Sequence, residues 1–122
     1  MPVARRYVSI FRMIEKTIDE IEAKIRSAEA VGDDRKRELI QLLDRLKAEV
    51  GGLEKTHGEQ AQSIAGFARI SAHEATRDDQ NPQLRELSVR GLKSSVEGFE
   101  KSHPRLVELV NRISDTLSKW GI

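Results

Sequence analysis

The chain has 122 residues, of which 34% are charged and only 4% aromatic, with 21 basic against 20 acidic side chains and no cysteine. This length suits one domain with a modest core, and the lack of cysteine excludes disulfides, thiolate catalysis and cysteine-ligated zinc. Balanced charge and few aromatic rings disfavour a nucleic-acid binder, and no apolar run approaches the roughly 20 residues of a membrane span. We therefore expect a soluble cytoplasmic protein, and the abundance of Ala, Leu, Ile, Glu, Lys and Arg predicts an all-α fold.

The first predicted helix covers about residues 11–30. Residues 1–12 are expected to be a poorly ordered lead-in to a single helical-bundle domain over residues 13–122. Apolar side chains then recur at heptad spacing: Phe11, Ile14, Ile18, Ile21 and Ile25. This repeat predicts one buried seam, with Glu22 and Arg26 as an i,i+4 pair on the outside.

A second long helix is predicted over about residues 34–77, where a Leu-rich half continues into an Ala-rich half. Its apolar seam keeps the same phase across Gly51 and Gly52, although glycine weakens a helix by about 1 kcal/mol relative to alanine. The Ala-rich half carries a stripe of methyl groups: Ala61, Ala65, Ala68, Ala72 and Ala75. Such a stripe lets another helix approach closely, and it buries too little area to be stable without cover.

The turn-forming run from Asp78 to Pro82 precedes a third predicted helix over about residues 83–119. Its seam is expected to begin with Leu84 and Leu87, and Pro104 is expected to kink it. One echo links the second and third helices: Leu53-Glu-Lys-Thr-His57-Gly resembles Phe99-Glu-Lys-Ser-His103-Pro. Both copies are interpreted as helix bends with a capping hydroxyl.

Pairing the helices about the two turns predicts a three-helix core with a two-helix, Ala-rich arm. In this register residues 57–77 meet only residues 83–103, and His57 lies level with His103. The arm cannot bury both of its faces, so we expect a second copy to complete a four-helix arrangement. The predicted self-association surface is the alanine stripe, and the predicted assembly is a homodimer.

Two Glu-x-x-His motifs suggest an alternative function. Glu54 with His57 and Glu100 with His103 have the spacing that puts two ligands on one helix face, as in di-iron carboxylate bundles. A simpler interpretation is a polar layer formed by the two histidines in an apolar seam. Apart from this alternative no metal or cofactor is predicted. No enzyme is predicted either, because no Gly-rich phosphate loop and no nucleophile with a positioned base is recognised.

A further candidate site lies near the end of the Ala-rich half, where His73, Glu74 and Arg77 form a cluster for a protein partner or a small anion. A solvated helix end with charges that suit the helix dipole is the simpler explanation of this trio.

The segments SIAGFARISAHEATR and NPQLRELSVRGLKSSVEGFEKSHPRLVELVNRISDTLSKWGI resemble domain-of-unknown-function family 4404, a group of small bacterial helical proteins. The resemblance covers about residues 13–122 and includes the HEATR, SHP and closing WGI segments. It implies no activity, because the family that it resembles has none assigned. We therefore expect a non-enzymatic, self-associating adaptor or accessory protein.

Overall fold

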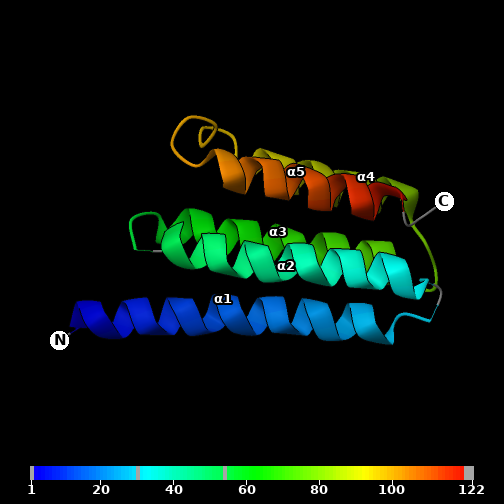
Figure 1. The fold of residues 1–122 in the computed structure, drawn as a ribbon, viewed down its shortest axis with the longest axis horizontal. Helices are drawn as coiled ribbons and strands as arrows, with labels where there is room; N and C mark the ends of the chain where they lie inside the picture. The colour runs from blue at the N-terminus through cyan, green and yellow to red at the C-terminus, as the bar shows by residue number, and fades with distance from the viewer. Residues whose placement is uncertain (1, 30, 54, 120–122) are drawn as a thin grey trace.

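The computed structural model describes residues 2–29, 31–53 and 55–119, with side chains from residue 12 onward. These residues form five helices and no strand, which confirms the predicted all-α class. The helices are α1 (Pro2–Ser27), α2 (Asp33–Leu53), α3 (Gly58–Thr76), α4 (Pro82–Ser94) and α5 (Pro104–Lys119). The chain turns back at each connection, so all five helices run along a common long axis (Figure 1).

The helices form three layers. α2 and α3 make the middle layer, α1 covers one side of it, and α4 with α5 covers the other side (Figure 1). Within the described residues, α1 lies across both α2 and α3 and contacts neither α4 nor α5. As a consequence α2 and α3 touch each other only slightly, whereas α4 and α5 pack directly against each other.

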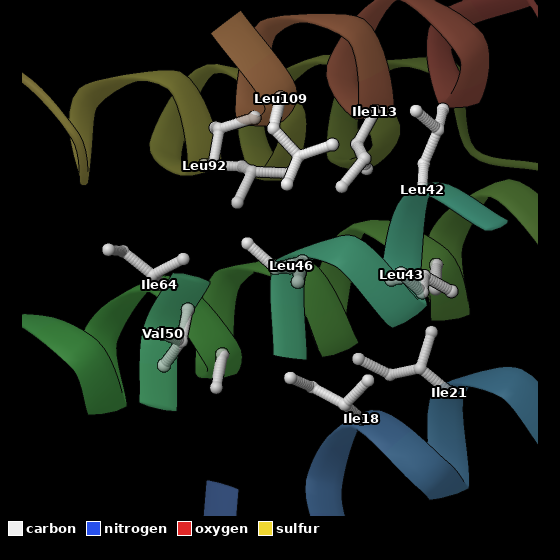
Figure 2. Close-up of a cluster of buried hydrophobic side chains, with 14 of the residues drawn as sticks. Ile18, Ile21, Leu42, Leu43, Leu46, Val50, Ile64, Leu92, Leu109 and Ile113 are labelled. Carbon is white, nitrogen blue, oxygen red and sulfur yellow. The ribbon is translucent and has the colours of Figure 1, made fainter. Parts of the chain in front are cut away.

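One aliphatic core runs through the three layers. Ile18 of α1 and Leu43 of α2 lie on one side of it, and Leu92 of α4 and Ile113 of α5 lie on the other side (Figure 2). None of these four side chains is more than 1% exposed. Burial of such a side chain contributes roughly 1.5–3 kcal/mol, so the shared core stabilises the packing of all three layers.

α1 begins at Pro2, so the expected helix start near residue 11 is too late. Proline is favoured in the first turn of a helix, and the next glycine or proline along the chain is Gly32. The prediction relied on the start of the heptad repeat, but a helix does not need an apolar repeat in every turn. The side chain of Phe11, the first member of that repeat, lies outside the described residues.

The predicted second helix, residues 34–77, is two helices joined by a reversal of the chain. α2 ends at Leu53, whose carbonyl accepts hydrogen bonds from the backbone N–H groups of Thr56 at 3.2 Å and His57 at 2.8 Å. The glycine pair just before this turn weakens the helix where the reversal occurs. The apolar repeat keeps its phase across this turn because α2 and α3 bury their apolar faces in the same core. A continuous repeat is therefore no proof of one continuous helix.

The predicted third helix, residues 83–119, is also two helices. α4 ends at Ser94, and in the loop that follows Gly98 has a φ of 96°, a left-handed conformation that glycine adopts without a Cβ clash. Pro104 begins α5 instead of kinking a longer helix, because its missing N–H is not needed in a first turn.

These two reversals remove the predicted three-helix core and two-helix arm. After the first reversal α3 lies beside α1 and α4, so no pair of helices projects from the bundle. The predicted pairing of residues between helices assumed three long helices. Each additional turn changes which helix faces pack against each other.

Candidate functional site

The alanine stripe of α3 is buried within one chain. Its five members are at most 3% exposed: Ala61, Ala65, Ala68, Ala72 and Ala75. α1 and α4 pack along α3 and supply the cover that we expected from a second copy. The alanine stripe is packed against other helices, as expected, but these helices belong to the same chain and not to a second copy. In this fold the stripe is not accessible to another chain.

The exposed apolar side chains gather on α3 and α4 instead. Among the described residues four of the five exposed large hydrophobic side chains lie there: Phe67 (38% exposed), Ile70 (46%), Leu84 (43%) and Leu87 (63%). Spacing of three residues puts the two members on each helix on one helix face. We call these four residues the α3/α4 apolar face.

The two helices meet at this face. A Cβ atom placed on Gly91 of α4 would lie 2.5 Å from the ring of Phe67, so the ring rests on the glycine. The absence of a side chain at Gly91 thus allows Phe67 to bridge α3 and α4. Leu84 and Leu87 were expected in the buried seam, and their exposure corrects that expectation.

His57 and His103 lie together at the end of the bundle where the α2–α3 and α4–α5 loops meet (Figure 1). Their ring centroids are 6.1 Å apart, and the ring of Phe99 contacts both edge-on, at 5.3 Å and 5.4 Å. Thr56 Oγ1 lies 2.8 Å from Nδ1 of His57, and Ser102 Oγ lies 3.0 Å from Nδ1 of His103. Edge-to-face contacts of this kind contribute about 0.5–1.5 kcal/mol each, so the cluster fastens the two loops together.

The arrangement does not provide the helical metal site of the alternative. Glu54 lies outside the described residues, and Glu100 lies in a loop, where its Oε2 accepts a hydrogen bond from the Gly98 N–H at 2.8 Å. The described residues contain no group of three or more His, Asp or Glu side chains suited to a metal ion. For the second motif, the assumption that Glu100 and His103 share a helix face is wrong.

The trio near the end of α3 is engaged inside the chain. Arg77 Nη1 donates to Glu74 Oε1 at 2.8 Å, and Lys24 Nζ of α1 lies 2.6 Å from Nδ1 of His73. The hydrogen bond and the charge of Glu74 raise the pKa of Arg77. These contacts stabilise the end of α3 and tie it to α1.

A buried carboxyl group between α1 and α2 was not recognised from the sequence. The side chain of Glu22 is only 7% exposed, and its Oε1 has no hydrogen-bond partner among the described residues. Burial raises the pKa of Glu22 from 4.5 to about 7, with further increases from the hydrogen bond and charge of Asp44 and decreases from Lys47 and Arg26. The heptad pattern placed Glu22 outside the seam, and only the position of α2 reveals that it is covered.

Comparison with family models gives a match over most of the chain. A family model described as Domain of unknown function (DUF4404) matches residues 39–122, which include most of α2 and all of α3, α4 and α5. No curated protein and no solved structure matches the chain. Of the described helices, none is both long enough and apolar enough to cross a membrane.

Proposed function

Because the chain belongs to the family described as Domain of unknown function (DUF4404), whose description assigns no activity, we propose a function from its surface. The chain is a non-enzymatic accessory protein that self-associates through the α3/α4 apolar face. The observation that supports this proposal is that four of the five exposed large hydrophobic side chains among the described residues share this face. The self-association predicted from the sequence is thus proposed again, but through the α3/α4 apolar face and not through the alanine stripe.

The proposal rests on the cost of leaving this face in water. Contiguous apolar patches on monomers are usually small, and larger ones mark contact sites. Leu87 is 63% exposed and Ile70 is 46% exposed, so each would bury further area at roughly 25 cal/mol per Å² on association. A two-fold axis through the face would place α3 and α4 of both copies in a four-helix contact, with the same residues on each side.

The test is the oligomeric state of two matched variants. Leu87→Glu puts a charge on the proposed face, whereas Met13→Glu makes the same change at a residue of α1 that is 59% exposed. Sedimentation velocity should show a dimer for the parent, a dissociation constant raised at least about 100-fold by Leu87→Glu, and a change below about threefold for Met13→Glu. Circular dichroism should show unchanged helix content in both variants. A parent that is monomeric at about 100 µM, or equal weakening by both variants, would refute the proposal.

A further inference from the structure

The two hairpins, α2 with α3 and α4 with α5, repeat one another at an offset of 46 residues, which is the difference between positions 103 and 57. Residues 46–57 (LKAEVGGLEKTH) and 92–103 (LKSSVEGFEKSH) are identical at seven of twelve positions. The equivalent core residues are buried alike, with Leu46 and Leu92 both 0% exposed. In both hairpins the repeated segment ends directly before the second helix begins. The offset therefore relates buried core positions and the start of the second helix, although residues 49–53 are helical and the equivalent residues 95–99 lie in a loop.

On the first hairpin, α1 packs on a surface that we call its seat, with polar contacts from α2 in addition to the contact of Lys24 with His73 of α3. The contacts are Lys36 Nζ to the carbonyl of Arg26 and Lys47 Nζ to Asp19 Oδ1. Asp44 of α2 also acts on the carboxyl group of Glu22 and raises its pKa after the larger effect of burial. Leu43 lies between these polar residues along α2, and Ile21 of α1 points toward it (Figure 2). Asp19 and Glu22 are three residues apart, so one face of α1 presents both carboxylates to α2.

The equivalent surface of the second hairpin is an open groove of about 370 Å³ between α4 and α5. Adding 46 to the seat positions 36, 43, 44 and 47 gives Pro82, Val89, Arg90 and Lys93, and all four line the groove. No described helix covers the outer side of α4 and α5, away from α2 and α3, as α1 covers the outer side of α2 and α3 (Figure 1). The groove is thus the uncovered counterpart of the α1 seat.

The charge of the groove differs from that of the seat. Arg90 stands where α2 has Asp44, Lys93 keeps the position of Lys47, and Arg85 stands where α2 has Leu39. Glu86 is the acid in the lining, and it pairs with Arg90 at 2.6 Å while both side chains are about 70% exposed (71% and 69%). Lys93 pairs with Asp115 of α5 at 3.3 Å, and these side chains are 46% and 63% exposed. Exposed ion pairs of this kind contribute at most about 1 kcal/mol, so a ligand can replace them.

We propose that the α4/α5 groove binds an acidic amphipathic helix of a partner protein. This helix lies across α4 and α5 as α1 lies across α2 and α3, and two carboxylates spaced like Asp19 and Glu22 meet Lys93 and Arg90. Charge complementarity identifies this occupant. In the seat of α1, Asp44 lies near Glu22, whereas the equivalent residue of the groove is Arg90, which attracts a carboxylate. Because α4 packs directly on α5, whereas α2 and α3 touch only slightly, the partner helix is expected to have a narrower apolar stripe than α1.

This inference does not rest on the proposed self-association. The groove lies on the side of α4 that faces α5, since Ser118 of α5 also lines it. The α3/α4 apolar face lies on the other side of α4, where Gly91 meets Phe67 of α3. The two surfaces can therefore be disrupted separately.

The probe is a fluorescent synthetic peptide of residues 12–27 in which Ile14→Ala and Ile25→Ala narrow the apolar stripe. These changes remove two fully or nearly fully buried isoleucines, so the peptide competes poorly for the seat of α1. A second peptide carries in addition Asp19→Lys and Glu22→Lys. Fluorescence anisotropy gives the dissociation constants with the intact protein, and backbone amide shifts measured by NMR give the location.

We expect the first peptide, which keeps Asp19 and Glu22, to bind with amide shifts confined to α4 and α5. The protein variant Arg90→Glu with Lys93→Glu should weaken this binding at least about tenfold, and the basic peptide should bind that variant better than it binds the parent. Arg112→Glu, in the cavity between α2 and α5, is the matched control and should change binding less than about twofold. Equal binding of both peptides, equal weakening by the control, shifts confined to α1 and α2, or no saturation by about 1 mM would overturn the proposal.

Discussion

The two hairpins share a core but differ in what lies on their outer side. At equivalent positions α2 has Leu39, which is fully buried under the neighbouring helices, and α4 has Arg85 in an open groove. Inward positions such as Leu46 and Leu92 are unchanged between them. The repeat thus has the same residues where the hairpins join, while the outer faces differ: that of the first hairpin is covered, and that of the second is an open groove. The helix that covers the first hairpin is α1.

The largest effect should come from exchanging residues between the two outer faces. Leu39→Arg places a charge at a position that is 0% exposed, and it should lower the free energy of unfolding by about 3–5 kcal/mol. The reciprocal change, Arg85→Leu, alters a partly exposed groove residue and should stay within about 1 kcal/mol of the parent. Urea unfolding monitored by circular dichroism measures both. Similar costs for the two changes would mean that the faces are not different environments.

The buried carboxyl group of Glu22, on the side of α1 that faces α2, should make the stability of the protein sensitive to pH. Because burial raises the pKa of Glu22 to about 7, the folded chain holds this proton more tightly than the unfolded chain. The resulting stabilisation is complete below the usual pKa of 4.5 and is lost as the pH rises through about 7. Glu22→Gln cannot ionise, so it should be more stable than the parent at pH 8 by on the order of 2 kcal/mol and should flatten the decline between pH 5 and pH 8.

The control for this prediction is Glu20→Gln, which removes an exposed carboxylate from the same helix. Thermal unfolding at several pH values should show the parental pH dependence in the control. A Glu22→Gln variant that loses stability with rising pH as steeply as the parent would contradict the assignment to this group.

A smaller change in stability should follow from exchanging Ser114 of α5 with its equivalent in α3, Ala68. The Ser114 side chain is 0% exposed, and its hydroxyl has no hydrogen-bond partner among the described residues. Removing a buried unpaired hydroxyl relieves a desolvation cost, so Ser114→Ala should stabilise the chain by about 1 kcal/mol. Ala68→Ser should destabilise it by a similar amount. Differential scanning calorimetry would show opposite shifts, and a destabilised Ser114→Ala would mean that the hydroxyl is satisfied in solution.

The smallest effect concerns the two equivalent lysines. Lys47 forms an ion pair with Asp19 of α1, whereas Lys93 pairs with Asp115 of α5 at 3.3 Å, so only the first lysine ties α1 to the bundle. Exchange to alanine should cost less than about 1 kcal/mol in either case, because such pairs are weak in water. Hydrogen exchange should nevertheless become faster in α1 for Lys47→Ala and remain unchanged there for Lys93→Ala. Equal acceleration in both variants would argue against a specific role of Lys47.

The helical class and the family resemblance were accessible from the sequence because composition and long matching segments carry them. Composition and matching segments do not predict the breaks between α2 and α3 and between α4 and α5. An apolar repeat has the same phase whether it forms one long helix or two helices that face one core, and local turn chemistry then decides. The Gly-Gly pair and Pro104 are the local signals of these breaks, and continuity of the apolar seam does not outweigh them.

Site prediction depended on those breaks. The small area of a methyl group explains why the alanine stripe must pack against other helices. Which helices pack on it depends on how many helices the chain forms. His57 and His103 were expected to be level, and they are close, yet they meet as loop residues and not as members of two long helices. The burial of Glu22 and the exposure of Leu87 both depend on which neighbour lies against a helix, which periodicity alone does not specify.

The position of α1 also sets an order of assembly. Its contact with α3, Lys24 with His73, joins residues 49 apart in the chain, whereas Lys93 and Asp115 of the second hairpin are only 22 apart. Closing the longer loop costs more chain entropy, so we expect the second hairpin to form early on the folding pathway and α1 to join after the folding transition state. Substitutions in α1 such as Ile18→Ala should then accelerate unfolding and leave the folding rate nearly unchanged. The same helix would be the first to detach from the native bundle.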